Sequence, residues 1–261
     1  MAGPSPAPVV IGNRKLLLAL PVLAAALAAL AALAAHMARP KPALGLFTTL
    51  PVYWREAAEL GDLLADQGEA PWPRRALERD YVLRPLDVLA DGGRGDPLAG
   101  MRYLLMAQPR ALSPAENVAL DAWVRRGGHL LLFADPMLTA HSAFPLGDRR
   151  RPQEVVLLSP ILRHWGLDLQ FDDRQPAGER KAEIFGAEIP LDLPGRFALL
   201  PTAGGAAACT LKAEGVAAEC ALGRGRVLLL ADAALLDGAA VDSSPREAAL
   251  ALLADRAFGA E

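Results

Sequence analysis

The sequence predicts an α/β fold, with a mainly parallel sheet and helices on both faces. Residues 103–106 and 129–134 are short, mostly apolar runs, and one amphipathic helix separates them. Two strands joined by a crossover helix lie parallel, because an antiparallel pair needs only a hairpin. A further run of this kind, at 226–231, is typical of strands that are buried on both faces of a sheet.

The helix between the first two runs carries its own start and stop signals. Ser113 is placed as its N-cap, Pro114 takes the first helical position, and Glu116 completes a Ser-x-x-Glu capping box. Gly127 and Gly128 end it, because glycine adopts the left-handed conformation that closes many helices. The apolar side of this helix is formed by Leu120, Trp123 and Val124.

The other elements follow from spacing and turn residues. Short apolar runs predict strands at 44–50, 81–86 and 167–171. Pro85 cannot donate to a ladder, so the second of these is expected near an edge. Helical spacing predicts helices at 54–67, at 159–165 and after a cap at Ser244. Between about 175 and 225 this spacing disappears, which predicts a β-rich insertion or subdomain.

An apolar segment precedes the α/β part. Residues 16–35 contain only Leu, Ala, Val and one Pro. A helix of this length spans roughly 30 Å, the thickness of a bilayer core. The sequence therefore predicts a transmembrane anchor at 16–35, a short cytoplasmic tail at 1–15, a linker at 36–43 and the α/β domain at 44–261.

The flanking charges set the expected orientation. Basic residues lie on both sides of the segment, but no acidic residue precedes position 16, so the amino end is expected inside. This predicts a single-pass protein of the bacterial inner membrane with its C-terminal domain in the periplasm. Small residues at Ala34, Ala35 and Ala38 leave a cleaved signal peptide as the alternative, which would give a secreted protein. A net charge of −3 gives no reason to expect a nucleic-acid partner.

Residues 44–173 also carry a resemblance. The motifs "AQP", "LSPAENVALDAWVRRGGHLLLFADP" and "LLSPILRHWGLDLQFDD" occur in that order. Together they resemble the extracytoplasmic auxiliary domain of ABC-type transport systems of the gliding-motility kind. That family is similar in fold to class I glutamine amidotransferases but mostly lacks their catalytic residues. The resemblance implies a flavodoxin- or amidotransferase-like fold and a role beside a permease and an ATPase on other chains.

Candidate site residues lie where strands end, because open α/β sheets bind ligands beyond their carboxyl edge. The strand ends supply Thr48, Thr49, Asp87, Gln108, Asp135 and Asp232. The long aperiodic stretch after Asp135 adds His141, Phe144, Arg149, Arg150 and Arg151. Arginine is favoured both in anion sites and in protein interfaces, so this loop is the candidate docking site for an anionic ligand or a partner subunit.

No catalytic or metal-binding pattern stands out. The four histidines share no ligand spacing, no cofactor motif is present, and no Gly-x-Ser-x-Gly or Gly-x-Cys-x-Gly elbow occurs. Ser142, His141 and Asp135 are the one conceivable triad, although adjacent residues rarely face one another in the required geometry. We therefore expect a binding or scaffold domain, with a hydrolase of amidotransferase-like fold and a secreted ligand-binding protein as alternatives.

The two cysteines are expected to form a disulfide. If Glu214 and Gly215 make a two-residue hairpin turn, Cys209 and Cys220 lie opposite one another. Opposed residues in an antiparallel pair have Cα atoms about 4.5–5.5 Å apart, which a disulfide allows. The expected periplasmic location is oxidising and favours the bridge over two free thiols.

Overall fold

The structure is a computed structural model that describes residues 3, 40–56, 69–93, 95–201, 208–237 and 243–259. The expected anchor at 16–35 lies outside these residues, as does the expected tail at 1–15 apart from Gly3. Half of the expected linker, residues 36–39, and residues 57–67 of the expected helix also lie outside them. Within the described ranges, no helix has the length and apolar character needed to cross a bilayer. The unit that begins at Pro42 is the α/β domain.

A seven-stranded sheet forms the centre of this domain, in the order β2-β1-β3-β4-β11-β10-β9. Five neighbouring strands run parallel, and β10 and β9 add an antiparallel end. This confirms a mixed α/β fold with a mainly parallel sheet, and it places the strand with Pro85 at an edge. The strands are β1 (Ala43–Thr48), β2 (Val82–Pro85), β3 (Tyr103–Ala107), β4 (His129–Phe133), β9 (Ala208–Lys212), β10 (Ala217–Leu222) and β11 (Gly225–Leu230).

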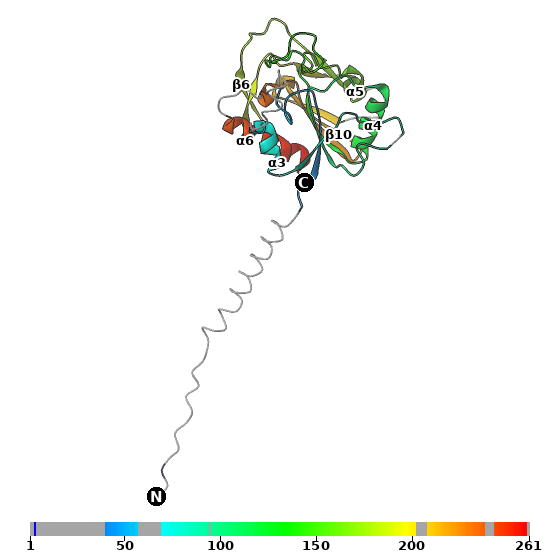
Figure 1. Cartoon of the computed structure of the whole chain (residues 1–261), viewed down its shortest axis with the longest axis vertical. Coiled ribbons are helices and arrows are strands. Elements are labelled where there is room, and N and C mark those ends of the chain that lie inside the picture. The colour runs from blue at the N-terminus through cyan, green and yellow to red at the C-terminus, as the bar shows by residue number, and fades with distance from the viewer. Residues whose placement is uncertain are drawn as a thin grey trace. The chain divides into compact units, whose positions relative to one another are not determined.

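Helices cover both faces of the sheet, as Figure 1 shows with α3 and α6 together on one side and α4 and α5 on the other. Helices α3 (Trp72–Glu78) and α6 (Ser244–Phe258) pack on the face that presents Leu105 and Leu131. Helices α4 (Pro114–Arg125) and α5 (Ser159–His164) pack on the face that presents Leu104 and Leu130. Successive strand residues point to opposite faces, which is why these strands are apolar throughout.

The capping prediction for α4 is confirmed, and the one for α6 is displaced by one residue. In α4 the Ser113 side chain accepts from the Glu116 N–H, and the Glu116 side chain accepts from the Ser113 N–H. In α6 the N-cap is Ser243, so Ser244 is already helical. Ser243 donates its hydroxyl hydrogen to the Glu247 carboxylate instead of capping a backbone N–H.

The β-rich stretch is not one insertion. Two small antiparallel sheets pair β5 (Leu167–Gln170) with β8 (Arg196–Leu199) and β6 (Arg180–Ile184) with β7 (Ala187–Leu191). The later strands β9 and β10 belong to the central sheet, because β10 turns back through Gly223 and pairs with β11.

The hairpin of β9 and β10 has the expected register, and a disulfide joins its two cysteines. Cys209 lies opposite Cys220 in the ladder and the two are bonded. Their Cα atoms are 4.0 Å apart, closer than the separation expected from strand geometry alone. The turn also differs, because Ala213 joins Glu214 and Gly215 in having a positive φ, in the short 3₁₀ turn η1 (Ala213–Gly215).

Candidate functional site

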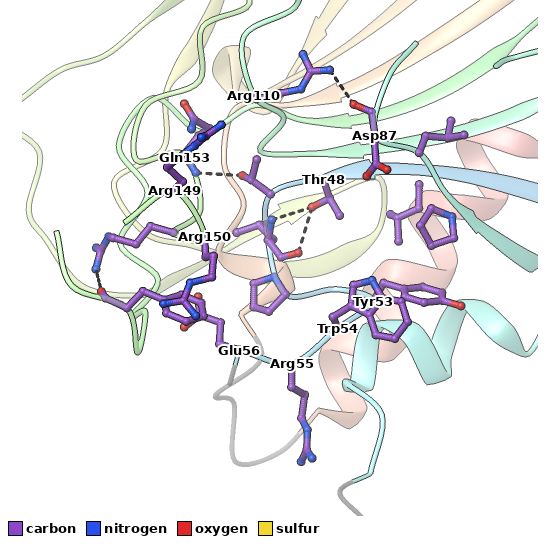
Figure 2. A pocket seen from close by; sticks show the side chains of 18 residues that line it. Thr48, Tyr53, Trp54, Arg55, Glu56, Asp87, Arg110, Arg149, Arg150 and Gln153 are labelled. Atoms are coloured by element: carbon purple, nitrogen blue, oxygen red, sulfur yellow. Dashed lines mark hydrogen bonds between the residues drawn. The ribbon is translucent and has the colours of Figure 1, made fainter. Parts of the chain in front are cut away.

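An open cleft lies at the carboxyl ends of β1 and β2 and has a volume of about 700 Å³. Figure 2 shows Thr48 between the two walls, with Tyr53 and Trp54 on one side and Arg149 and Arg150 on the other. The edge predicted from the sequence is therefore the edge that carries the cleft. Of the residues predicted for the site, those that line the cleft are Thr48, Thr49, Asp87, Phe144, Arg149, Arg150 and Arg151.

The two threonines hold the floor of the cleft together. The Thr48 hydroxyl donates to the carbonyl of Ala107 on β3 at 2.7 Å and accepts from the Leu50 N–H. The Thr49 hydroxyl donates to the Gln108 carbonyl and accepts from the Gln153 N–H at 3.0 Å. Both threonine hydroxyls donate their hydrogen to a backbone carbonyl, so these side chains fix the strand ends. Neither hydroxyl has a hydrogen left to donate to a ligand.

Gln108 and Asp135 were predicted as site residues, but both are buried and neither lines the cleft. The Gln108 amide bonds the backbone of Asp135 and the Gln153 carbonyl. The Asp135 carboxylate accepts from the N–H groups of Met137 and Ala233. Burial raises the pKa of Asp135 to about 6, because the charged form is the one that loses most from leaving water.

Asp232 is a second buried acid, at the end of β11 next to β4. It accepts from the N–H groups of Asp192 and Ala234. Burial raises its pKa well above the ordinary value, and the charge of Asp135 raises it further. The two carboxylates thus hold backbone segments in place near the ends of β4 and β11.

The arginine run is less available than the sequence suggests. Arg150 pairs with Asp148 at 2.7 Å, and its guanidinium carbon lies 4.1 Å from the centre of the Phe144 ring. That hydrogen-bonded pair lowers the pKa of Asp148 to about 2. Arg151 donates to the Phe144 carbonyl and pairs with Glu154. Only Arg149 of the three is exposed and without an ion pair among the described residues.

The opposite wall contains Trp54 and Arg55, which were expected to begin the helix at 54–67 but are not helical. Trp54 is 70% exposed and its ring lies edge-on to Tyr53, with ring centres 4.7 Å apart. Arg55 is exposed, and Figure 2 shows it extending away from Thr48. Their position in the segment that follows β1 was the available signal, since the segments that leave parallel strands begin at this edge.

Arg110 also lines the cleft and is held by an ion pair with the buried carboxylate of Glu116. It donates twice to Glu116, the closer contact being 2.7 Å, and it also donates to the Asp87 carbonyl. Burial alone would raise the pKa of Glu116, but hydrogen bonds from Arg110 and from the backbone of Ser113 and Leu89 lower it to about 2. The carboxylate that completes the capping box therefore also fixes a cleft residue.

The conceivable triad is not assembled. Ser142 donates to the carboxylate of Glu56 at 2.9 Å, and that carboxylate also accepts from the Ala143 N–H. His141 is exposed and is not among the residues that line the cleft. Across the described part of the chain, no group of three or more His, Cys, Asp or Glu side chains is arranged to hold a metal ion.

These features define an α/β domain with an open cleft at the carboxyl edge of its parallel strands. The chain belongs to the family described as Domain of unknown function (DUF4350), whose model matches residues 57–253. No curated protein matches the chain significantly.

Solved structures of low similarity include glycoside hydrolases. An exo-beta-1,4-mannosidase from an Opitutaceae bacterium is 13% identical with a TM-score of 0.48, over 87% of this chain and 38% of that one. A beta-galactosidase mutant from G. stearothermophilus is 14% identical with a TM-score of 0.45, over 84% of this chain and 30% of that one. The chain thus spans about a third of the length of these proteins, and such likeness says nothing about its activity.

Proposed function

We propose that this protein is a membrane-anchored, non-catalytic auxiliary component of an ABC-type transport system, and that its α/β domain binds a partner at the cleft. The observation that carries the proposal is which side chains of the cleft are engaged within the domain and which are exposed. The two threonine hydroxyls, Arg150 and Arg151 are committed to contacts within the domain, whereas Trp54 and Arg149 are exposed. Aromatic and arginine side chains are the groups that protein interfaces favour.

The proposed cellular location and partner subunits are supported by the sequence. The apolar segment at 16–35 supports an anchor in a bacterial inner membrane, with the domain in the periplasm. The motifs between 44 and 173 support the finer assignment of the fold as flavodoxin- or amidotransferase-like, and the association with permease and ATPase subunits on other chains.

Co-purification tests this function. The full-length tagged protein is purified from native membranes in mild detergent, as wild type and as Trp54→Ala and Arg149→Ala variants. We expect an ATPase and a permease with the wild type and at least a several-fold loss with both variants. Matched controls are Val118→Ala, an apolar side chain 70% exposed on α4, and Arg163→Ala, an exposed arginine on α5. The proposal would be overturned if the wild type, the two cleft variants and the two controls all recovered the subunits equally. It would also be overturned if none of the five proteins recovered any subunit.

Hydrolysis assays address the enzyme alternative. The purified protein is incubated with amide and ester substrates, and we expect no turnover above a buffer blank. Turnover that Asp135→Asn or His141→Ala removes would replace the binding function with a hydrolase.

A further inference from the structure

Residues 136–158 belong to the loop between β4 and α5 and are here called the ridge; the ridge helps to line both the cleft and a second hollow. This second hollow, here called the outer hollow, has a volume of about 520 Å³. The base of the loop is closed by hydrogen bonds from Leu138 N–H to the Glu154 carbonyl and from Val156 N–H to the Asp135 carbonyl. Arg149 lines both the cleft and the outer hollow. Hydrogen bonds thus hold the base of the ridge in place, and its residues line two hollows.

Exposed apolar side chains gather at the outer hollow. Leu146 is 80% exposed, Leu157 57% and Val155 49%, and all three line it. Single exposed apolar residues are ordinary on protein surfaces, but several around one hollow mark an interaction site. Covering them removes apolar surface from water, which favours a partner that presents apolar groups of its own.

The charges around the outer hollow specify the partner further. Asp148 pairs with Arg150, and Glu154 pairs with Arg151, so these four charges compensate one another. Arg149 is left as the uncompensated cation of the ridge within the described residues. A guanidinium takes a carboxylate in a bidentate contact, so an acidic side chain complements it.

We infer that the ridge docks a segment of a partner protein that carries an acidic side chain for Arg149 and apolar side chains for the outer hollow. A small free anion could bind Arg149 but would leave the apolar side chains of the outer hollow exposed to water. Two copies of this chain related by a two-fold axis would bring like charges at Arg149 near one another. The inference rests on the proposed function and deepens it, because it names the chemistry of the partner segment and adds the outer hollow to the cleft.

Site-specific photocrosslinking in native membranes tests the inference. A photoreactive phenylalanine derivative replaces Leu146 or Leu157 in the full-length protein, and Val118 on α4, outside both hollows, serves as the exposed apolar control. We expect crosslinks from the two loop positions and not from the control. The crosslinked peptide, sequenced by mass spectrometry, is expected to contain Asp or Glu within a few residues of Leu, Ile, Val, Phe or Met.

A charge exchange makes the test specific. Arg149→Glu is expected to lower the crosslinking yield from position 157 about ten-fold, the loss typical of a charge-assisted contact. Replacing the identified acid of the partner with Arg is expected to restore it. Crosslinks to lipid or to a second copy of this chain would overturn the inference, as would a crosslinked peptide that is basic or wholly polar. An equal crosslinking yield from position 118, or no recovery of the yield after the charge exchange, would also overturn it.

The outcomes separate this inference from the proposed function. If Trp54→Ala abolishes co-purification while Leu146→Ser and Leu157→Ser leave it intact, the cleft binds a partner and the outer hollow takes no part. If none of the three variants matters, both the ridge and the cleft are rejected. Melting temperatures of all variants are compared with the wild type, so that a loss of folding is recognised.

Discussion

Gln108 and Asp135 bond one another across the ends of two neighbouring strands. Gln108 Nε2 donates to the Asp135 carbonyl and the Asp135 N–H donates to Gln108 Oε1, both at 2.9 Å. The second Nε2 hydrogen goes to the carbonyl of Gln153 at 2.7 Å. Gln108 adopts φ 44°, a conformation that costs a non-glycine residue about 1 kcal/mol or more. One buried amide thus joins the strand ends to the ridge.

Gln108→Ala is expected to lower the free energy of unfolding by about 3 kcal/mol, because it strips hydrogen-bond partners from three backbone groups. Urea denaturation measures the change. Gln170→Ala provides the control, since that amide is exposed and is expected to change the free energy by less than about 0.5 kcal/mol. Similar small changes in both variants would show that the Gln108 network is not a main support of the sheet edge.

The buried acids predict a dependence of stability on pH. The pKa of Asp135 is raised to about 6 in the folded state, above its unfolded value of about 3.9. The native state therefore binds more protons between these values, so this contribution is complete below about pH 4 and is lost as pH rises through about 6. A shift of this size corresponds to about 2–3 kcal/mol.

Urea denaturation of wild type and Asp135→Asn between about pH 4 and 8 isolates this contribution. The free-energy difference between the two proteins is expected to change in favour of the wild type as pH falls. The wild-type pKa of Asp232 is also raised, so a residual slope is expected in the variant. Parallel profiles would contradict the assignment to Asp135.

The disulfide is expected to stabilise the antiparallel end of the sheet. Cys209→Ser with Cys220→Ser should lower the free energy of unfolding by about 1–3 kcal/mol, less than loop closure alone gives because the hairpin already restrains the chain. Denaturation with and without reductant measures it. Mass spectrometry of non-reduced peptides from native membranes should find the cysteines linked, whereas free thiols that alkylate without reductant would reject both the bridge and the oxidising location.

Arg151 and Arg149 are expected to differ in their contribution to stability, because Arg151 is bonded within the loop and Arg149 is exposed. Arg151→Ala should lower the free energy of unfolding by about 1–2 kcal/mol, because its guanidinium bonds the Phe144 carbonyl and Glu154. Arg149→Ala should change it by less than about 0.5 kcal/mol. Hydrogen exchange across residues 144–154 is expected to accelerate only in the first variant. Equal acceleration in both would remove the distinction between a bracing and an available arginine.

The anchor prediction is tested by fractionation. If residues 16–35 span the membrane and remain attached, the protein should stay in the membrane fraction through a carbonate wash at full length. A soluble species that begins between His36 and Arg39 would instead establish a cleaved signal peptide and a secreted protein.

Much of the fold followed from the sequence because its determinants are local. The α4 capping box involves residues three positions apart, and the hairpin register that opposes Cys209 and Cys220 follows from counting outward from the turn. Apolar runs on both sides of one helix were enough to make β3 and β4 parallel neighbours. Local steric and hydrogen-bonding rules act over a few residues, so a single sequence displays them directly.

The sequence also located the cleft, because the carboxyl edge of a parallel sheet is fixed once strand direction is known. Only the tertiary structure decided which residues at that edge are available. Gln108, Asp135 and the two threonines each have a hydrogen-bond partner that lies 27 to 104 positions away along the chain. Asp148 and Glu154 lie only two and three positions from the arginines that they pair with, and the conformation of the loop decides which of the three arginines are paired. A side chain is free or engaged according to what packs beside it, and that depends on distances in the folded domain rather than on spacing in the sequence.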